Sequence, residues 1–145
     1  MITDIKKIGD PILKQRCEPI DISDINYDTL TPLIIAMTTI MHEHGGIGLA
    51  ANQIGVSKRI LVIDVGKTLA IINPVIWEFK NWIVGKEGCL SIPGEEYDVK
   101  RATWIKIKFT NIHGQEHEVV VDDPLLARVV QHEVDHLDGI LICDK

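Results

Sequence analysis

Two histidines one helical turn apart, in an otherwise apolar segment near the end of the chain, constrain its fold more than any other feature. Residues 124–139 begin with a proline that follows two aspartates and end at a glycine, which is typical of a capped helix. His132 and His136 project from one face of that helix, because residues four apart lie one turn above each other. Most other positions are apolar, so we expect the helix to pack in the core, where unpartnered histidines would be costly. Histidines buried in such a helix would therefore need polar partners.

These histidines belong to the sequence H-E-V-D-H, residues 132–136, which fits the H-E-x-x-H pattern of single-metal hydrolases. Glu133 is rotated by about 100° from His132 around the helix axis, so it would lie beside an ion held by the imidazoles rather than on it. A carboxylate there can take a proton from a metal-bound water. A helix with two surface histidines would show the same five letters, so the motif alone leaves that alternative open.

A catalytic metal needs a third protein ligand and one open position. Few residues follow His136, so we expect this ligand from upstream, and Cys89 in the segment E-G-C-L-S is the candidate. A glycine before the thiol and a Pro-Gly pair shortly after it indicate a tight turn. Three cysteines do not suggest a disulfide framework, and we interpret Cys17 and Cys143 as small apolar residues.

Residues 46–53, G-I-G-L-A-A-N-Q, follow an amphipathic helix that we predict over residues 25–43. Glycines and alanines let the backbone approach a ligand or another element closely. A close-packed turn between a helix and a strand is the alternative, since the segment lacks the strand-before, helix-after context of a dinucleotide-binding loop.

The remaining pattern predicts an α+β fold, with antiparallel or mixed sheets around a central helix that carries the H-E-x-x-H motif. The strands that we expect cover residues 59–65, 69–79 with a break at Asn73-Pro74, 104–109 and 118–121. A length of 145 residues suits one domain over residues 1–145.

Composition limits the partners of the chain. A net charge of −6 without a basic patch argues against nucleic acid. The N-terminus has no apolar segment typical of a signal peptide, and the longest apolar run is too short to span a bilayer. We therefore expect a soluble, cytoplasmic enzyme or binding protein without a membrane partner.

Together, the three segments resemble the three sequence motifs of the peptide deformylase family, G-x-G-apolar-A-A-x-Q, E-G-C-apolar-S and H-E-x-D-H. Every fixed position matches, in the same order, and the resemblance extends over nearly the whole chain. It implies a metal-dependent hydrolase that removes the N-terminal formyl group from the formylmethionine of nascent polypeptides.

The resemblance also implies roles for individual residues. Cys89, His132 and His136 would hold one divalent ion, Fe(II) natively, with Zn, Ni or Co as substitutes. Glu133 would act as the general base on the metal-bound water and would then donate the proton to the leaving amine.

The oxyanion that develops on the formyl group would face the side-chain amide of Gln53 and the backbone N–H of Leu90. A close wall beside the formyl hydrogen would exclude an acetyl group. The residues that we expect to bind the substrate, with an apolar pocket for methionine among them, are Gly46, Ile47, Gly48, Gly88, Leu125 and Val129.

The chain stops at Lys145 without the C-terminal helical extension of many bacterial members, which resembles short phage-encoded forms and would place a viral member in the host cytoplasm. Since that extension contributes to ribosome attachment, the sequence leaves open whether this protein works close to the ribosome.

Arg128 stands where an apolar residue would be expected if it lined the pocket, so it points outward or rims the pocket. Arg101 would pair with an acid near the site, with Glu87 as the nearest candidate.

Two other functions are compatible with the sequence. The first is a hydrolase of the same fold that acts on another N-acyl peptide, because substrate choice depends on pocket dimensions. The second is a non-catalytic, metal-binding descendant of an enzyme, against which the presence of both Glu133 and Gln53 argues.

Overall fold

The computed structural model describes residues 4–145 and confirms the predicted α+β class. Its five strands form one antiparallel sheet in the order β1-β2-β3-β4-β5. The strands are β1 (Gly48–Ala50), β2 (Ile60–Asp64), β3 (Thr68–Cys89), β4 (Ile92–Thr110) and β5 (Glu116–Val121), and the helices are α1 (Tyr27–Glu43) and α2 (Pro124–Leu137). The 3-10 helices are η1 (Pro11–Lys14), η2 (Ile22–Asp24), η3 (Ala51–Ile54) and η4 (Ile142–Asp144). No helix of the described residues is long and apolar enough to cross a membrane.

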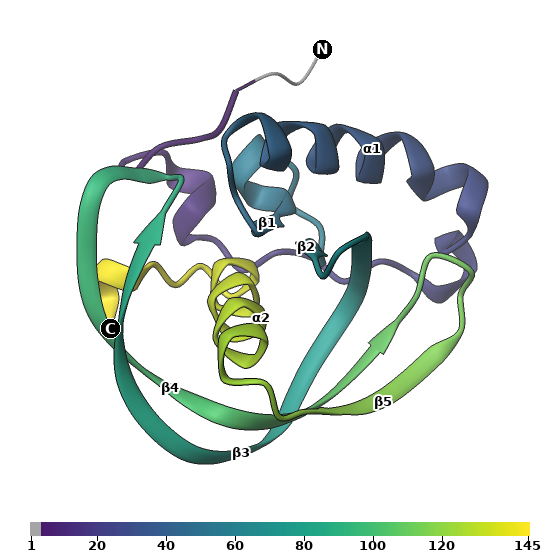
Figure 1. The fold of residues 1–145 in the computed structure, drawn as a ribbon. Coiled ribbons are helices and arrows are strands. Elements are labelled where there is room, and N and C mark those ends of the chain that lie inside the picture. The colour runs from purple at the N-terminus through teal and green to yellow at the C-terminus, as the bar shows by residue number, and fades with distance from the viewer. Residues whose placement is uncertain (1–3) are drawn as a thin grey trace.

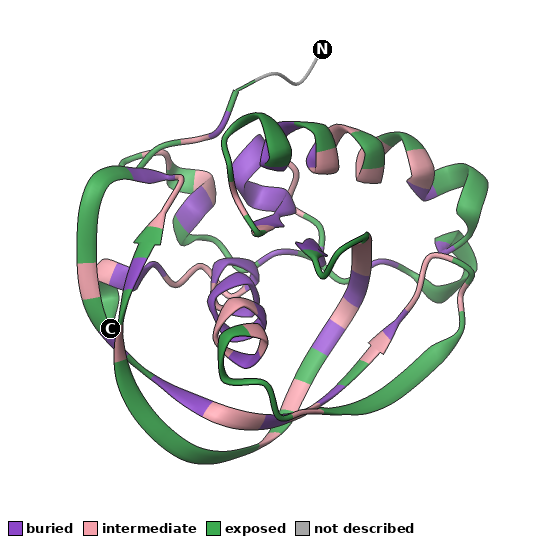
Figure 2. Cartoon of the chain, in the orientation of Figure 1, coloured by how far each residue is buried: buried purple, intermediate pink, exposed green. Residues whose placement is uncertain are grey.

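Helix α2 occupies the middle of the molecule, as predicted from its apolar composition. In Figure 1 the long strands β3 and β4 curve beneath it, and α1 lies above. The Asp123 side chain caps its first turn by accepting a hydrogen bond from Leu126 N at 3.0 Å, and Pro124 needs no partner for the N–H it lacks. Figure 2 shows that most of α2 is buried. Its histidines are therefore held inside the fold.

Helix α1 begins later than predicted, at Tyr27 rather than residue 25, because Asn26 caps it by accepting from Thr29 N at 2.9 Å. Its buried face, with Met37 and Met41, packs on β1 and β2. A second apolar cluster lies between α2 and the sheet and contains, among others, Ala127, Val130, Leu137, Ile105 and Ile107. The two clusters fix both helices against the same sheet.

Strands β3 and β4 are much longer than the predicted segments 69–79 and 104–109. They pair almost from end to end, and a two-residue turn joins Cys89 to Ile92. The expected break at Asn73-Pro74 is a bulge within β3, where Asn73 has a φ of 51° and the register shifts. Residues 80–84 are all exposed. The hairpin therefore lacks, at this point, the alternation of apolar and polar residues that predicts a half-buried strand.

Gln131 ties α2 to the sheet where the two elements cross. Its Oε1 accepts from Ala102 N at 3.0 Å, and its Nε2 donates to Ala102 O at 2.8 Å. Both residues are buried, so the side-chain amide takes the place of a neighbouring strand for β4 at this point. This pairing sets the depth at which α2 lies on β4.

We expect Gln131→Leu to lower the free energy of unfolding by about 2–6 kcal/mol. The N–H and C=O of Ala102 would lose a buried partner, at about 1–3 kcal/mol for each group. Urea unfolding followed by circular dichroism measures the loss. Gln115→Leu, in the exposed turn between β4 and β5, is the control and should cost less than about 0.5 kcal/mol. Similar losses for both variants would contradict a pairing role for Gln131.

Candidate metal centre and active site

The fold brings together the three residues predicted to hold a metal. Cys89 ends β3, whereas His132 and His136 lie one turn apart on α2. One potential ligand atom from each residue lies within 4.8 Å of the other two. The Cys89 Sγ is 3.2 Å from His136 Nε2, so the thiol meets the face on which both imidazoles project.

Glu87 orients one of these imidazoles from behind. Its Oε1 lies 2.9 Å from His132 Nδ1, which leaves Nε2 of that ring to face the other donors. Arg101 donates to both Glu87 oxygens at 2.9 Å, and Arg128 Nη1 donates to Oε2 at 2.5 Å. The predicted pairing of Arg101 with Glu87 is thus confirmed. Arg128 lines the open cavity at this site rather than pointing outward.

These contacts keep the Glu87 carboxylate ionised. Burial alone would raise the pKa of Glu87, but the hydrogen bonds from His132 and Arg101 outweigh it and hold the pKa at about 2. Arg101 also pairs with Asp135 of α2. A buried anion with several donors is therefore fixed beside the candidate ligands.

Glu133 differs, because its carboxylate is buried without full hydrogen bonding. Its Oε1 has no partner in the described structure, and burial raises the pKa of Glu133 to about 7 against the opposing charge of His132. A Cβ atom on Gly48 would lie 2.8 Å from Glu133 Oε2, so β1 packs closely on this side chain. A buried carboxylate that lacks a partner calls for a functional explanation.

The donor cluster has the electrostatics of a cation site. Burial would lower the pKa of His132, but the charge of Glu133 and hydrogen bonds with Cys89 and Glu87 raise it to about 10. Burial and the charge of His132 lower the pKa of His136 well below its ordinary value. The surroundings thus favour one positive charge among these groups, and a thiol with two imidazoles is a donor set that suits a transition-metal ion.

Gln53, the last residue of the segment 46–53, lies beside the thiol of Cys89. Its Oε1 accepts from Ala50 N at 3.0 Å, which fixes the amide. Its Nε2 donates to Ser91 Oγ at 3.1 Å and lies 3.8 Å from Cys89 Sγ. One of its two N–H groups is therefore well bonded, whereas the other faces the donor cluster with only a long contact.

An open cavity of about 890 Å³ leads to this cluster. It is lined by all of the sequence-predicted site residues except His136, which lies deeper; those at the cavity are Gly46, Ile47, Gly48, Gln53, Gly88, Cys89, Leu90, Leu125, Val129, His132 and Glu133. Leu125 is 63% exposed and Ile47 is 49% exposed, so these two lie at the mouth rather than in the interior.

Sequence reasoning missed the contacts of two motif residues. The sequence predicts Glu87 only as a partner for Arg101, yet its carboxylate also bonds to His132 and Arg128. The sequence predicts no role for Ser91, although its hydroxyl accepts a hydrogen bond from Gln53. Both belong to the fixed positions of E-G-C-apolar-S, which was the available signal.

Two imidazoles and a thiol that converge beside an underbonded carboxylate, at the end of a peptide-sized cavity, define a metal-dependent hydrolase. Residues 2–145 match the polypeptide deformylase family. The chain belongs to this family, whose members depend on a metal and remove the formyl group from nascent peptides, and it is a hydrolase with that activity.

Individual relatives agree with this assignment over their length. A peptide deformylase from Thermoanaerobacter pseudethanolicus is 46% identical over 142 residues, which cover 97% of this chain and 87% of that protein. The crystal structure of peptide deformylase from Thermotoga maritima matches with a TM-score of 0.93 at 39% identity, over 100% of this chain and 97% of that one. The Met-Ala-Ser-bound crystal structure of class I type b peptide deformylase from Acinetobacter baumannii matches with a TM-score of 0.93 at 35% identity, over 100% of this chain and 99% of that one.

We expect the three thiols to differ in reactivity. Cys17 is 1% exposed, and burial raises the pKa of its thiol, so iodoacetamide should label it only after unfolding. Cys143 and Cys89 are partly exposed and should be labelled in the native, metal-free protein. Added Zn²⁺ should protect Cys89 and leave Cys143 unchanged, as measured by mass spectrometry of tryptic peptides. Equal protection of both thiols, or of neither, would contradict the metal centre.

Proposed function

We propose that the chain deformylates N-terminal formylmethionine by means of one divalent ion held by Cys89, His132 and His136. The observation that carries this proposal is the buried, underbonded carboxylate of Glu133 beside three converging donor atoms. A closed structural site would use four protein ligands, whereas this cluster opens onto a cavity. That opening supports catalysis over the alternative of a non-catalytic metal-binding protein.

Fe(II) is the ion that we propose for the native enzyme, with Zn, Ni or Co as substitutes. Thiolate and imidazole ligands suit each of these ions, and the choice of iron rests on the family resemblance. When bound, the ion would act as a Lewis acid on the formyl oxygen and would make water a nucleophile near neutral pH. The anionic Glu87 behind His132 would increase the basicity of that ligand.

Glu133 would move the proton in both halves of the reaction. It takes a proton from the attacking water as the new C–O bond forms, and it gives that proton to the peptide nitrogen as the C–N bond breaks. The products are formate and a free amine. A pKa raised by burial to about 7 suits a group that must accept and return a proton near neutral pH.

Two neutral donors would stabilise the oxyanion. The N–H of Gln53 that now makes only a 3.8 Å contact with Cys89 Sγ can turn to the developing charge while Ala50 holds its Oε1. The backbone N–H of Leu90, in the two-residue turn after β3, is the second. Fixed donors of this kind need little reorganisation as charge appears.

The methionine side chain would occupy the apolar part of the cavity beside Val129, with Ile47 and Leu125 at its mouth. Gly46, Gly48 and Gly88 would leave room for the peptide backbone along the sides of the cavity. The A. baumannii relative was solved with Met-Ala-Ser bound, which supports a peptide that begins with methionine as the ligand here. Another N-acyl peptide is the second candidate.

We further propose that residues 1–145 work as one catalytic domain in the cytoplasm, or in the host cytoplasm if the protein is viral. Proximity to the ribosome would follow from the substrate, because formylated N-termini exist on nascent chains.

Iron-loaded protein should hydrolyse a formyl-Met-Ala-Ser peptide at least about 100-fold faster than its acetyl counterpart, because a methyl group would collide where the formyl group carries hydrogen. The measurement is kcat/KM for the released amine, with chelator-treated protein as the control. Similar rates for both peptides would favour an enzyme of broader N-acyl specificity. No turnover of either peptide would favour the non-catalytic alternative.

Glu133→Gln should retain the metal and lower kcat by about 10²–10⁴, because an amide cannot accept the proton. Gln53→Ala should lower kcat by about 10²–10³, as for other single oxyanion donors. Metal content, measured by elemental analysis, separates these effects from loss of the ion. Near-normal kcat for Glu133→Gln would remove the proposed base, and a change confined to KM for Gln53→Ala would assign that residue to substrate binding.

A further inference from the structure

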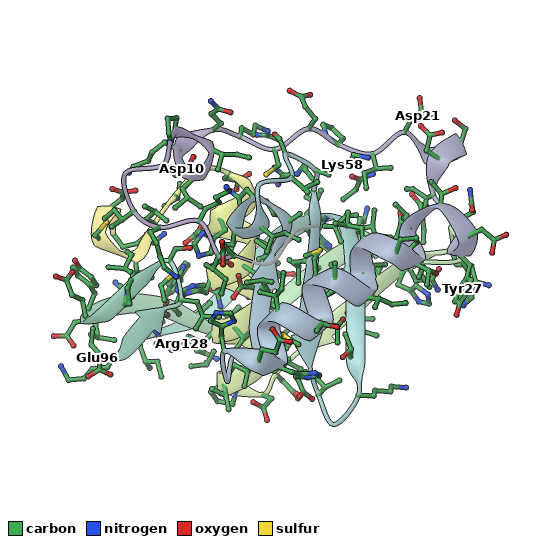
Figure 3. All side chains as sticks on the ribbon, turned by 90° about the horizontal axis from the view of Figure 1, so that it is seen from above. Asp10, Asp21, Tyr27, Lys58, Glu96 and Arg128 are labelled. Atoms are coloured by element: carbon green, nitrogen blue, oxygen red, sulfur yellow. The ribbon has the colours of Figure 1, made fainter. Side chains whose placement is uncertain are left out.

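Arg128 bounds the side of the cavity that faces the β3–β4 hairpin. Its Nη1 donates to Glu87 Oε2 at 2.5 Å and to Val99 O at 3.0 Å, and its Nη2 lies 3.4 Å from Ile83 O. In Figure 3 Arg128 lies on the same side of the molecule as Glu96, another cavity residue. The Arg128 side chain is 14% exposed, so this long cation is largely enclosed.

A glycine makes room for this guanidinium. A Cβ atom on Gly85 would lie 2.9 Å from Arg128 Nη2 and 3.0 Å from its Cζ. On the other flank of α2, a Cβ atom on Gly48 would lie 2.9 Å from Val129 Cγ1. Two side chains of α2 thus bound the cavity, and each lies against a glycine of a strand: Arg128 against Gly85 and Val129 against Gly48.

The guanidinium cannot swing aside at low cost. It bonds to a buried carboxylate and to carbonyls of two different strands, and a charge-assisted hydrogen bond to Glu87 is stronger than a neutral one. Glu87 would keep three of its four hydrogen bonds without Arg128, two from Arg101 and one shared with His132. The candidate metal ligands therefore retain their support if Arg128 is shortened.

We propose that Arg128 is a specificity-determining residue, which sets the width of the pocket for the first side chain of the peptide. Its guanidinium, held over Gly85, leaves room for the unbranched methionine and excludes wide aromatic side chains. This inference rests on the proposed function, because it concerns the same cavity and the same peptide.

The test compares formyl-Phe-Ala-Ser with formyl-Met-Ala-Ser. In Arg128→Ala the ratio of kcat/KM for the phenylalanine peptide to that for the methionine peptide should rise at least about tenfold, within the range expected when a pocket gains or loses bulk. A purely structural role would lower both values by the same factor, as would partial unfolding. Lys100→Ala, an exposed position on β4, should leave the ratio unchanged. A ratio in Arg128→Ala equal to that of the wild type would overturn the proposal.

Gly85→Ala tests the packing of Arg128 over Gly85 independently. In the wild-type background the added methyl should displace the guanidinium and change the same ratio at least about threefold, whereas in the Arg128→Ala background it should change the ratio less than twofold. Equal effects in both backgrounds would contradict the packing of Arg128 over Gly85. Arg128→Met, which keeps an unbranched stem without the charge, replaces Arg128→Ala if that variant does not fold.

Calorimetry separates failure of this inference from failure of the proposed function. Binding of Met-Ala-Ser and Phe-Ala-Ser requires no turnover, and Arg128→Ala should improve the affinity for Phe-Ala-Ser relative to Met-Ala-Ser. A wild-type protein that binds these peptides but never deformylates would refute the proposed function alone. An active wild-type enzyme whose peptide preference does not respond to Arg128→Ala would refute the role of Arg128 alone.

Discussion

The arrangement of the site depends on the hydrogen bonds and ion pairs of the Glu87 carboxylate. It joins β3, which carries Cys89, to β4 through Arg101 and to α2 through Arg128 and His132. A buried anion without partners would be strongly destabilising, and so would the two guanidinium groups without it. The same contacts that satisfy these charges hold the hairpin against the helix. The thiol and the imidazoles converge because these contacts hold β3, which ends at Cys89, against the helix that carries both histidines.

The arrangement of the site also requires α2 to lie close to two strands, β1 and β3. Gly48 of β1 lies against Val129 and Glu133, and Gly85 of β3 lies against Arg128. Side chains larger than hydrogen at either glycine would push the helix away or displace the residues that face the cavity. The G-x-G segment, which could have been a ligand-binding loop, is thus required at Gly48 by packing against the helix that carries the proposed base.

Much of the local structure could be predicted from the sequence. The caps and apolar face of α2, the long helix before the glycines and the positions of β2 and β5 follow from short-range patterns. The full extent of β3 and β4 did not, because the hairpin is exposed around residues 80–84 and its alternation is lost there. The sequence predicts a break at Asn73-Pro74 where the structure has a bulge, because a proline after asparagine suggests an end of pairing when the partner strand is unknown.

The sequence by itself determined the chemistry of this protein: two histidines at helical spacing with a glutamate between them, a thiol in a glycine-bounded turn, and three motifs that identify the family. Local geometry suffices for these, because a helix places residues four apart on one face whatever surrounds it. Only the tertiary structure decided that Glu87 holds His132, that Gln131 completes β4 at Ala102 and that Arg128 lies over Gly85. Those contacts depend on the register of a long hairpin and on the depth of α2 across it, which many packed side chains set together.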